Sequence, residues 1–384
     1  SKSDNQSYVL LLLLQSAYFL YFALSEVSDY FEIFPSLSDY KNINLMISNL
    51  GFNSDFYLGI SFTILQIILG INCFYIYKRG IDSYAKHKIT SSPFLLGIGG
   101  DSGVGKTTIS DALETVFTSA NSISLRGDDM HRWQRGHKKW KEFTHLDPKA
   151  NLLHQEIGIL NNLKSGKKIY RKSYKHSDGT FGEENLLLPS NLIIFEGLHP
   201  FYISRQRQIF DLKLFIKPEK NLSKHWKIRR DIEERDYSKE KILKTLKERE
   251  EDAKHFVESQ AKYADILIMP TTEGKLQNVG GENENPEITF KLLMPNFIYL
   301  EPILDEIAAI KGINVEHVYD EDDRQEISLS GQAPIEEISS VGKAHITGLE
   351  DIGIDYPQWP QGSFGVLILL ITYYIFEEAD YGKE

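Results

Sequence analysis

A glycine-rich segment in the first third of the chain carries the residues best suited to chemistry. Gly100, Gly105, Lys106 and Thr107 match the spacing GxxxxGK[ST], and the match begins at the last residue of an apolar run over 93–100. Glycines let backbone N–H groups turn towards phosphate oxygens, and a helix N-terminus adds partial positive charge. Because the lysine ammonium reaches the β- and γ-phosphates and the threonine hydroxyl ligates Mg²⁺, the spacing predicts binding of ATP with Mg²⁺. The residues expected to contact nucleotide are Gly100, Asp101, Ser102, Gly103, Val104, Gly105, Lys106, Thr107 and Thr108.

Acidic residues follow two later apolar stretches that have the pattern of buried strands. The stretch 122–133 ends in two aspartates and a histidine, and 191–202 contains a second apolar run that ends in an acid. That acid, Glu196, is placed like a Walker-B acid and is a candidate for holding Mg²⁺ directly or through water. An arginine-rich helical stretch (226–252) and another buried-strand pattern (262–270) follow. Ligands of open α/β sheets bind beyond the carboxyl ends of such strands.

Six short motifs occur along the chain in this order: GDSGVGKTT, GDDMH, THLDPKAN, EGLHPFY, IRRDIEERDYS and KYADILI. Their sequences and their order resemble those of the phosphoribulokinases and uridine kinases over about residues 93 to 270. The resemblance is closer to the phosphoribulokinases. The resemblance implies an α/β P-loop kinase fold, in which a mainly parallel sheet is flanked by helices and an arginine-bearing lid covers the site. It also implies transfer of a phosphoryl group to a hydroxyl group.

The resemblance further implies roles for single residues. Asp128 matches the catalytic base and acts together with Lys106, whereas Asp129 is expected to be a turn residue. Arg230 and Arg235 match lid arginines that close on the nucleotide's phosphates; the alternative is an ordinary salt-bridged helix face. The residues that match the acceptor-binding segments, for which exposed surface loops are the alternative, are His131, Arg132, Asp147, Asn151, Tyr174 and His176.

Two features depart from the family pattern, and the first bears on the acceptor. The basic stretch after the histidine, which recognises the acceptor's phosphate in phosphoribulokinases of this type, is here QRGHKKWKEF. The acceptor therefore stays open between a small sugar phosphate and a nucleoside. Cys73 is the only cysteine, which excludes an internal disulfide and regulation by a pair of thiols.

Two uncharged apolar runs precede the kinase motifs, at 8–24 and 56–77. A membrane-spanning helix needs about 20 apolar residues, so the pair predicts a two-helix transmembrane hairpin. The positive-inside rule places the kinase motifs on the cytoplasmic or mitochondrial-matrix side. A cleavable signal peptide and a buried helical hairpin are the alternatives. The basic residues after the second run are Lys78, Arg79, Lys86 and Lys88.

Length and composition complete the prediction. The chain has 384 residues, and its formal net charge of −11 argues against nucleic-acid binding. We expect a membrane anchor over 1–88, a P-loop kinase domain over 89–270, and a C-terminal α/β extension packed on that domain over 271–384. The apolar run 362–376 is shorter than a full span and is predicted to be a buried helix of this extension.

The predicted function is that of a membrane-anchored kinase, with ATP, an acceptor hydroxyl and membrane lipid as partners. The alternative is a kinase-fold accessory subunit of a membrane complex, such as a respiratory-chain assembly, that binds nucleotide with little turnover. A kinase for a lipid-linked sugar would also account for the apolar runs, although no motif supports it.

Overall fold

The computed structural model describes residue 67 and residues 92–381, except 176, 235–236, 273, 275, 277–278, 280–285, 321–322 and 350–356. The predicted transmembrane hairpin lies outside the described residues apart from Ile67. The chain divides into two compact units, Ser1–Lys86 and His87–Glu384. Every element below belongs to the second unit, which contains both the kinase motifs and the predicted extension.

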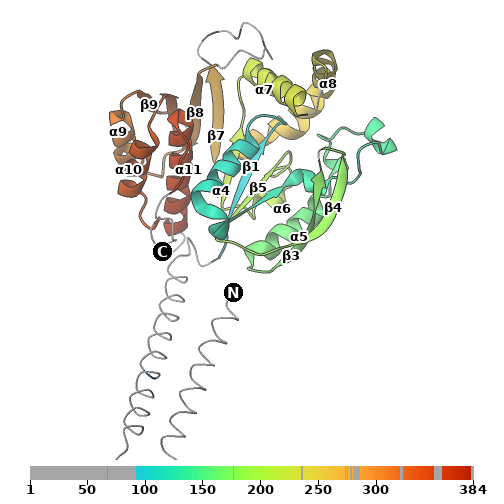
Figure 1. The fold of residues 1–384 in the computed structure, drawn as a ribbon, viewed down its shortest axis with the longest axis horizontal. Coiled ribbons are helices and arrows are strands. Elements are labelled where there is room, and N and C mark those ends of the chain that lie inside the picture. The colour runs from blue at the N-terminus through green and yellow to red at the C-terminus, as the bar shows by residue number, and fades with distance from the viewer. Residues whose placement is uncertain are drawn as a thin grey trace, which may run out of the picture. The chain divides into compact units, whose positions relative to one another are not determined.

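An eight-stranded sheet forms the centre of this unit, in the order β2-β5-β1-β6-β7-β8-β10-β9 (Figure 1). The pairs from β2 to β7 are parallel, as expected for strands joined through helices. The pairs from β7 to β9 are antiparallel. The strands are β1 (Phe94–Gly100), β2 (Ser122–Arg126), β5 (Leu192–Gly197), β6 (Leu212–Ile216), β7 (Ile266–Thr272), β8 (Ile288–Pro295), β9 (Ile313–Tyr319) and β10 (Arg324–Gly331).

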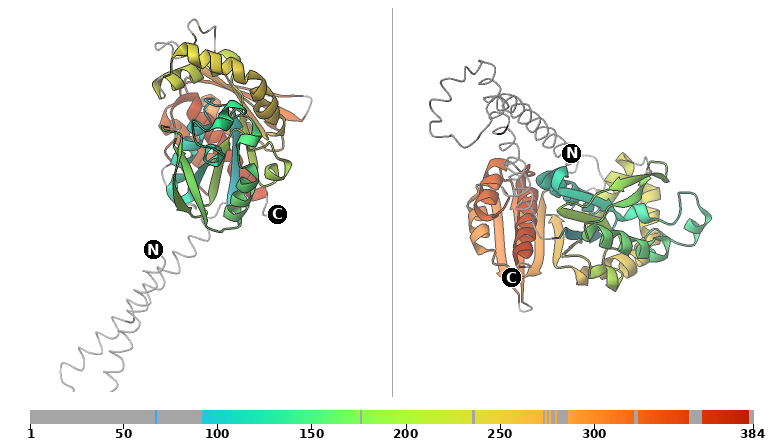
Figure 2. Two further views of the ribbon diagram at one scale, coloured as in Figure 1. Left: turned by 90° about the vertical axis from the view of Figure 1, so that its right-hand side faces the viewer. Right: turned by 90° about the horizontal axis from the view of Figure 1, so that it is seen from below.

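Helices and a small ribbon surround the sheet, and the C-terminal elements (orange to red) lie together at one side of the unit (Figures 1 and 2). The helices are α4 (Lys106–Asn121), α5 (Leu153–Lys164), α6 (Ser204–Arg207), α7 (Lys220–Glu233), α8 (Lys239–Asp252), α9 (Glu301–Ala309), α10 (Ile335–His345) and α11 (Gly362–Tyr381). A separate antiparallel ribbon is formed by β3 (Ile169–Lys175) and β4 (Thr180–Leu187).

The core lies on both faces of the sheet because β1 is apolar along its whole length. Alternate strand residues point to opposite faces. Leu96 and Ile98 belong to the cluster that contains Ile109 of α4, whereas Leu95 belongs to the other cluster, with Leu160 of α5. A strand buried on both faces is typical of parallel sheets. Together with the parallel pairs from β2 to β7, it confirms the predicted α/β fold with a mainly parallel sheet flanked by helices.

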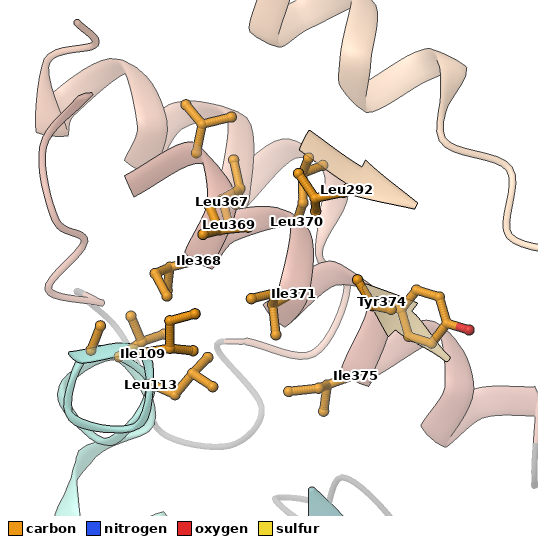
Figure 3. Packing of buried hydrophobic residues seen from close by; sticks show 14 of the residues in the cluster. Ile109, Leu113, Leu292, Leu367, Ile368, Leu369, Leu370, Ile371, Tyr374 and Ile375 are labelled. Atoms are coloured by element: carbon orange, nitrogen blue, oxygen red, sulfur yellow. The ribbon is translucent and has the colours of Figure 1, made fainter. Parts of the chain in front are cut away.

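The C-terminal apolar run forms α11, and the prediction that it is a buried helix is confirmed. Leu369 and Ile371 have no exposed surface. Ile109 and Leu113 of α4 point towards the side chains of α11, among them Ile368 (Figure 3). Among the described helices, α11 is the one long and apolar enough to cross a membrane, and 78% of its apolar window is buried inside the unit.

The predicted boundary near residue 270 falls within β7, which continues the parallel half of the sheet and pairs with β8 of the predicted extension. Residues on both sides of that boundary therefore share one sheet and one hydrophobic cluster, which includes Ile268 and Leu292. The division into 89–270 and 271–384 stays a prediction.

Candidate active site

A cavity of about 840 Å³ opens beyond the carboxyl ends of the parallel strands. Its walls include the glycine-rich loop, the ends of β2 and β5, one side of α7, and residues of β8 and α11. The volume is within the range of small-molecule sites, which is roughly 300–1,000 Å³. The position agrees with the general location of ligands in open α/β sheets.

The glycine-rich loop connects β1 to α4 as predicted. Gly103 and Gly105 have φ values of 83° and 97°, a region that favours glycine, and Gly105 immediately precedes the first helical residue. The Nζ atom of Lys106 donates to the carbonyl oxygens of Gly100 and Asp101, at 3.0 and 2.6 Å. The lysine ammonium is therefore held directly over the loop at the N-terminus of α4.

Thr107 and Glu196 meet although they are far apart in the sequence. The Thr107 hydroxyl donates to the carboxylate of Glu196, and Oγ1 is 3.0 Å from each carboxylate oxygen. Glu196 is 4% exposed, and the Nε atom of Arg126 lies 3.5 Å from its Oε1 atom. Burial raises the pKa of Glu196, against the opposing effect of the Lys106 ammonium. Burial lowers the pKa of Lys106, against the carboxylates of Glu196 and Asp128.

These side chains fit a magnesium–nucleotide complex. A hydroxyl and a carboxylate oxygen are ligands that Mg²⁺ prefers, and the ion usually takes its other ligands from phosphate and water. Within the part of the chain that the structure describes, no group of three or more His, Cys, Asp or Glu side chains forms an all-protein metal site. The residues present thus fit Mg²⁺ held jointly by Thr107, Glu196 and a nucleotide.

Asp128 lies beside the predicted acceptor residues. Its side chain is 35% exposed and lines the cavity, and its Oδ1 atom is 3.7 Å from Nε2 of His131. His131 is buried, and its Nδ1 atom is 2.8 Å from Oδ1 of Asn151. The Asn151 amide nitrogen donates to two backbone carbonyls, so its oxygen faces the histidine and Nδ1 carries the proton. Tyr174 packs edge-on against His131, with ring centroids 5.1 Å apart.

The other predicted acceptor residues lie differently. Asp147 accepts a hydrogen bond from the backbone N–H of Lys149 at 2.8 Å and thereby caps a short 3₁₀ turn. The side chain of Arg132 is exposed, while its backbone N–H donates to Ala150. His176 lies outside the described residues. The structure thus brings His131, Asn151 and Tyr174 together with Asp128. The acceptor-binding roles of all six residues stay predictions.

Arg230 of α7 reaches the glycine-rich loop. Its Nη2 atom donates to Oγ of Ser102 at 3.2 Å, and the guanidinium also bonds Asp231. A Cβ atom at Gly103 would lie 3.2 Å from Nη1, so the loop and α7 are in close contact. Arg229 instead pairs with Glu233 one turn along the helix, as the salt-bridge alternative expects. Arg235 lies outside the described residues, and its role stays a prediction.

Several interactions near the site have no signal in the sequence. Asp129 accepts hydrogen bonds from the backbone of Tyr174, at 2.7 Å, and from Arg171, at 3.3 Å. Arg171 is 5% exposed and pairs with the buried Glu156, so it ties β3 to the turn that carries Asp128. Glu156 and Arg171 look like ordinary charged residues in a helix and a strand, and only the tertiary structure reveals this pair.

His199 was also missed, although it lies inside the motif EGLHPFY. Its Nε2 atom donates to the carbonyl of Leu146 at 2.7 Å. Burial lowers the pKa of His199 to about 4. The imidazole is therefore neutral at physiological pH and holds the loop that contains Leu146 against the end of β5.

Comparison with known proteins agrees with this geometry. The profile described as "Phosphoribulokinase / Uridine kinase family" matches residues 95–276. The chloroplastic phosphoribulokinase of Triticum aestivum is 30% identical over 261 residues, which are 62% of this chain and 63% of the relative. The uridine kinase of Streptococcus agalactiae serotype V is 32% identical over 185 residues, which are 46% of this chain and 86% of the relative. The chain belongs to the phosphoribulokinase/uridine kinase family.

The kinases of this family are phosphotransferases that act on hydroxyl groups and use ATP with Mg²⁺. Among solved structures, the phosphoribulokinase from Rhodobacter spheroides has a TM-score of 0.52 and 17% identity, and the match covers 75% of this chain and 99% of that one. This likeness shows the fold. The chain spans about three fifths of the length of the Triticum phosphoribulokinase and 54% of that of the Synechocystis enzyme.

Proposed function

We propose that this protein is a membrane-anchored kinase that transfers the γ-phosphate of ATP to a hydroxyl group of a small sugar phosphate or a nucleoside. One observation carries the proposal: Asp128 lines the same cavity as Lys106, Thr107 and Glu196. A carboxylate that can orient an acceptor hydroxyl therefore faces the groups that would hold the phosphates. Enzymes of phosphoryl transfer work chiefly by such positioning and by electrostatic stabilisation.

Each residue has a distinct part in this mechanism. Lys106 and the loop N–H groups bind the β- and γ-phosphates. Thr107 and Glu196 would hold Mg²⁺, which when bound would supply positive charge to the phosphate oxygens. Asp128 accepts the proton of the attacking hydroxyl. Arg230 presents a planar guanidinium to the phosphates, a geometry that suits charge spread over several oxygens.

The acceptor side supports a small polar acceptor. His131 and Asn151 form a buried hydrogen-bonded pair beside Asp128, so polar side chains lie directly behind this carboxylate. The stretch that follows His131 contains Lys138, Lys139 and Lys141. Its positive charge favours an acceptor that already carries phosphate, as in the relatives named phosphoribulokinase.

The membrane anchor is supported by the sequence. The uncharged runs at 8–24 and 56–77 have lengths suited to a bilayer, and basic residues follow the second run. An anchor of this topology keeps the kinase domain on the side of the membrane that contains ATP. The localisation on a cytoplasmic or mitochondrial-matrix face is part of the same proposal.

The decisive experiment is an acceptor screen with the full chain, purified in mild detergent. ADP release is measured with ATP, Mg²⁺ and a panel of pentose phosphates and nucleosides. We expect release with at least one acceptor, and the Asp128→Asn variant should lack it. Absence of release with every acceptor would overturn the kinase proposal. Co-migration with a large assembly at fixed stoichiometry, without turnover, would instead favour the accessory-subunit alternative.

A further inference from the structure

We infer that the C-terminal extension completes the nucleotide site, with Phe290 and Phe364 forming an apolar platform for the nucleobase. The inference rests on the proposed use of ATP as phosphoryl donor. Both phenylalanines line the cavity that contains Lys106 and Asp128. Both also lie beyond residue 276, where the match to the family profile ends. They therefore add to the nucleotide cavity a wall that the matched region does not supply.

The order of strands separates the polar and apolar sides of the cavity. The loop that holds Lys106 follows β1. Asp128 follows β2 and Glu196 lies near the end of β5, and both strands are on one side of β1. Phe290 lies in β8, on the other side of β1, opposite Pro270 of β7. A nucleotide whose phosphates lie on the loop can thus direct its γ-phosphate towards the acids and its base towards β7 and β8.

The side chains on the β7–β8 side suit a flat aromatic group. Ile216, Ile268 and Pro270 line the cavity together with the two phenylalanines, and none of these side chains has a hydrogen-bonding atom. The rings of Phe290 and Phe364 are 6.0 Å apart, centroid to centroid, and are inclined at 38°. Both residues are half-buried, so each ring keeps an open surface. Aromatic rings and nucleobases attract through stacking and burial of their faces.

The platform is held rigidly by the core of the extension. Phe364 lies in the first turn of α11, and the following turns contain Val366, Leu367 and Ile368, none of which is exposed. Phe290 is fixed by the ladder between β7 and β8. A platform held in place before binding loses little side-chain entropy when the base arrives.

The test uses two ligands that differ in the base. Binding of ATP with Mg²⁺ and of tripolyphosphate with Mg²⁺ is measured by calorimetry for the full chain and for Phe290→Ala, Phe364→Ala and Phe364→Leu. We expect affinity for ATP to fall about 5- to 100-fold in the alanine variants, the range found when a base-stacking side chain is removed. Affinity for tripolyphosphate should stay within about twofold, since stacking does not contribute to it.

Controls separate this inference from the proposed function. Phe297 follows β8, is 54% exposed and does not line the cavity, so Phe297→Ala should leave both affinities unchanged. Phe364→Leu keeps the core filled but removes the flat ring. It should therefore weaken the binding of ATP and leave the binding of tripolyphosphate unchanged. Unchanged ATP affinity in all Phe290 and Phe364 variants would overturn the platform and leave the kinase proposal intact. A wild-type chain that binds neither ligand would overturn both.

Discussion

The hydroxyl of Thr107 donates to the carboxylate of Glu196, which stands 89 positions later in the chain. Thr107 lies in the first turn of α4 and Glu196 near the end of β5, and the two meet because β1 and β5 are parallel neighbours. The two side chains predicted to hold Mg²⁺ are thus brought together by the sheet. Their relationship gives the first prediction.

Glu196→Gln should weaken the binding of Mg²⁺–ATP at least about tenfold, because even residues behind a metal ligand typically contribute that much. Burial raises the pKa of Glu196, so ionisation of this carboxyl lowers the stability of the folded state at neutral pH. The amide removes that cost, and the free energy of unfolding at pH 7 should not decrease. Calorimetry and urea denaturation measure the two quantities. Equal Mg²⁺–ATP affinity in wild type and variant would contradict the metal role.

Asp128→Asn should reduce phosphoryl transfer by about 100- to 10,000-fold, the usual contribution of a general base. Affinity for ATP should change by less than about twofold, since the amide cannot take a proton but fills the same space. Steady-state kinetics and nucleotide binding check both parts. Asp305→Asn, at an exposed position of α9, is the matched control. A parallel loss of Mg²⁺–ATP binding would assign Asp128 to the metal instead.

Arg230→Lys should lower kcat by about 100-fold or more. In related reactions, an arginine that stabilises the transferring phosphoryl group raises kcat by about 10³- to 10⁵-fold. Lysine keeps the charge but lacks the planar fork that contacts Ser102 and Asp231 together. The matched control is Arg205→Lys, at an exposed position of α6. An unchanged kcat would favour the alternative, in which Arg230 only belongs to an ordinary salt-bridged face of α7.

The glycine-rich loop and the buried strands were predictable because their signals are local. Spacing and apolar runs specify the turn from β1 to α4 without reference to the rest of the fold. Phe290 and Phe364 were not predictable in this way, since they approach each other only when α11 packs on β8. The antiparallel half of the sheet was likewise missed, because short apolar runs do not reveal which neighbour a strand will pair with.

The charged residues likewise include some that the sequence singles out and others that only the tertiary structure reveals. Asp128 and Glu196 stand at strand ends, where an acid is informative, whereas Arg171 and Glu156 occupy positions at which charged residues are common. Their pairing in the interior depends on the packing of α5 against β3, which no local pattern encodes. Prediction of structure thus succeeded where a short segment carries its own signal and failed where the structure depends on contacts between distant segments.

His199 should make the folded state sensitive to acid. Its pKa is about 4 in the folded protein and about 6.5 when exposed, so the unfolded chain binds a proton first as the pH falls. Stability is therefore lost between about pH 6.5 and pH 4, by about 3 kcal/mol in total. His199→Gln keeps a donor for the Leu146 carbonyl and should lose less stability over this range. Urea denaturation from pH 7 to 4.5 measures the difference, and equal slopes for the two proteins would contradict it.

Ile371→Ala tests whether α11 stabilises the kinase domain as a core helix. Ile371 is fully buried, and the helix packs against α4, which begins at the glycine-rich loop. Truncation of a core isoleucine typically costs about 2–5 kcal/mol through lost burial and a residual cavity. The free energy of unfolding should fall by that amount, whereas Val318→Ala, at a position 58% exposed on the edge strand β9, should change it by less than about 0.5 kcal/mol. Equal stability of both variants would show that α11 lies outside the core, and Phe364 would then lack the rigid support that the base platform needs.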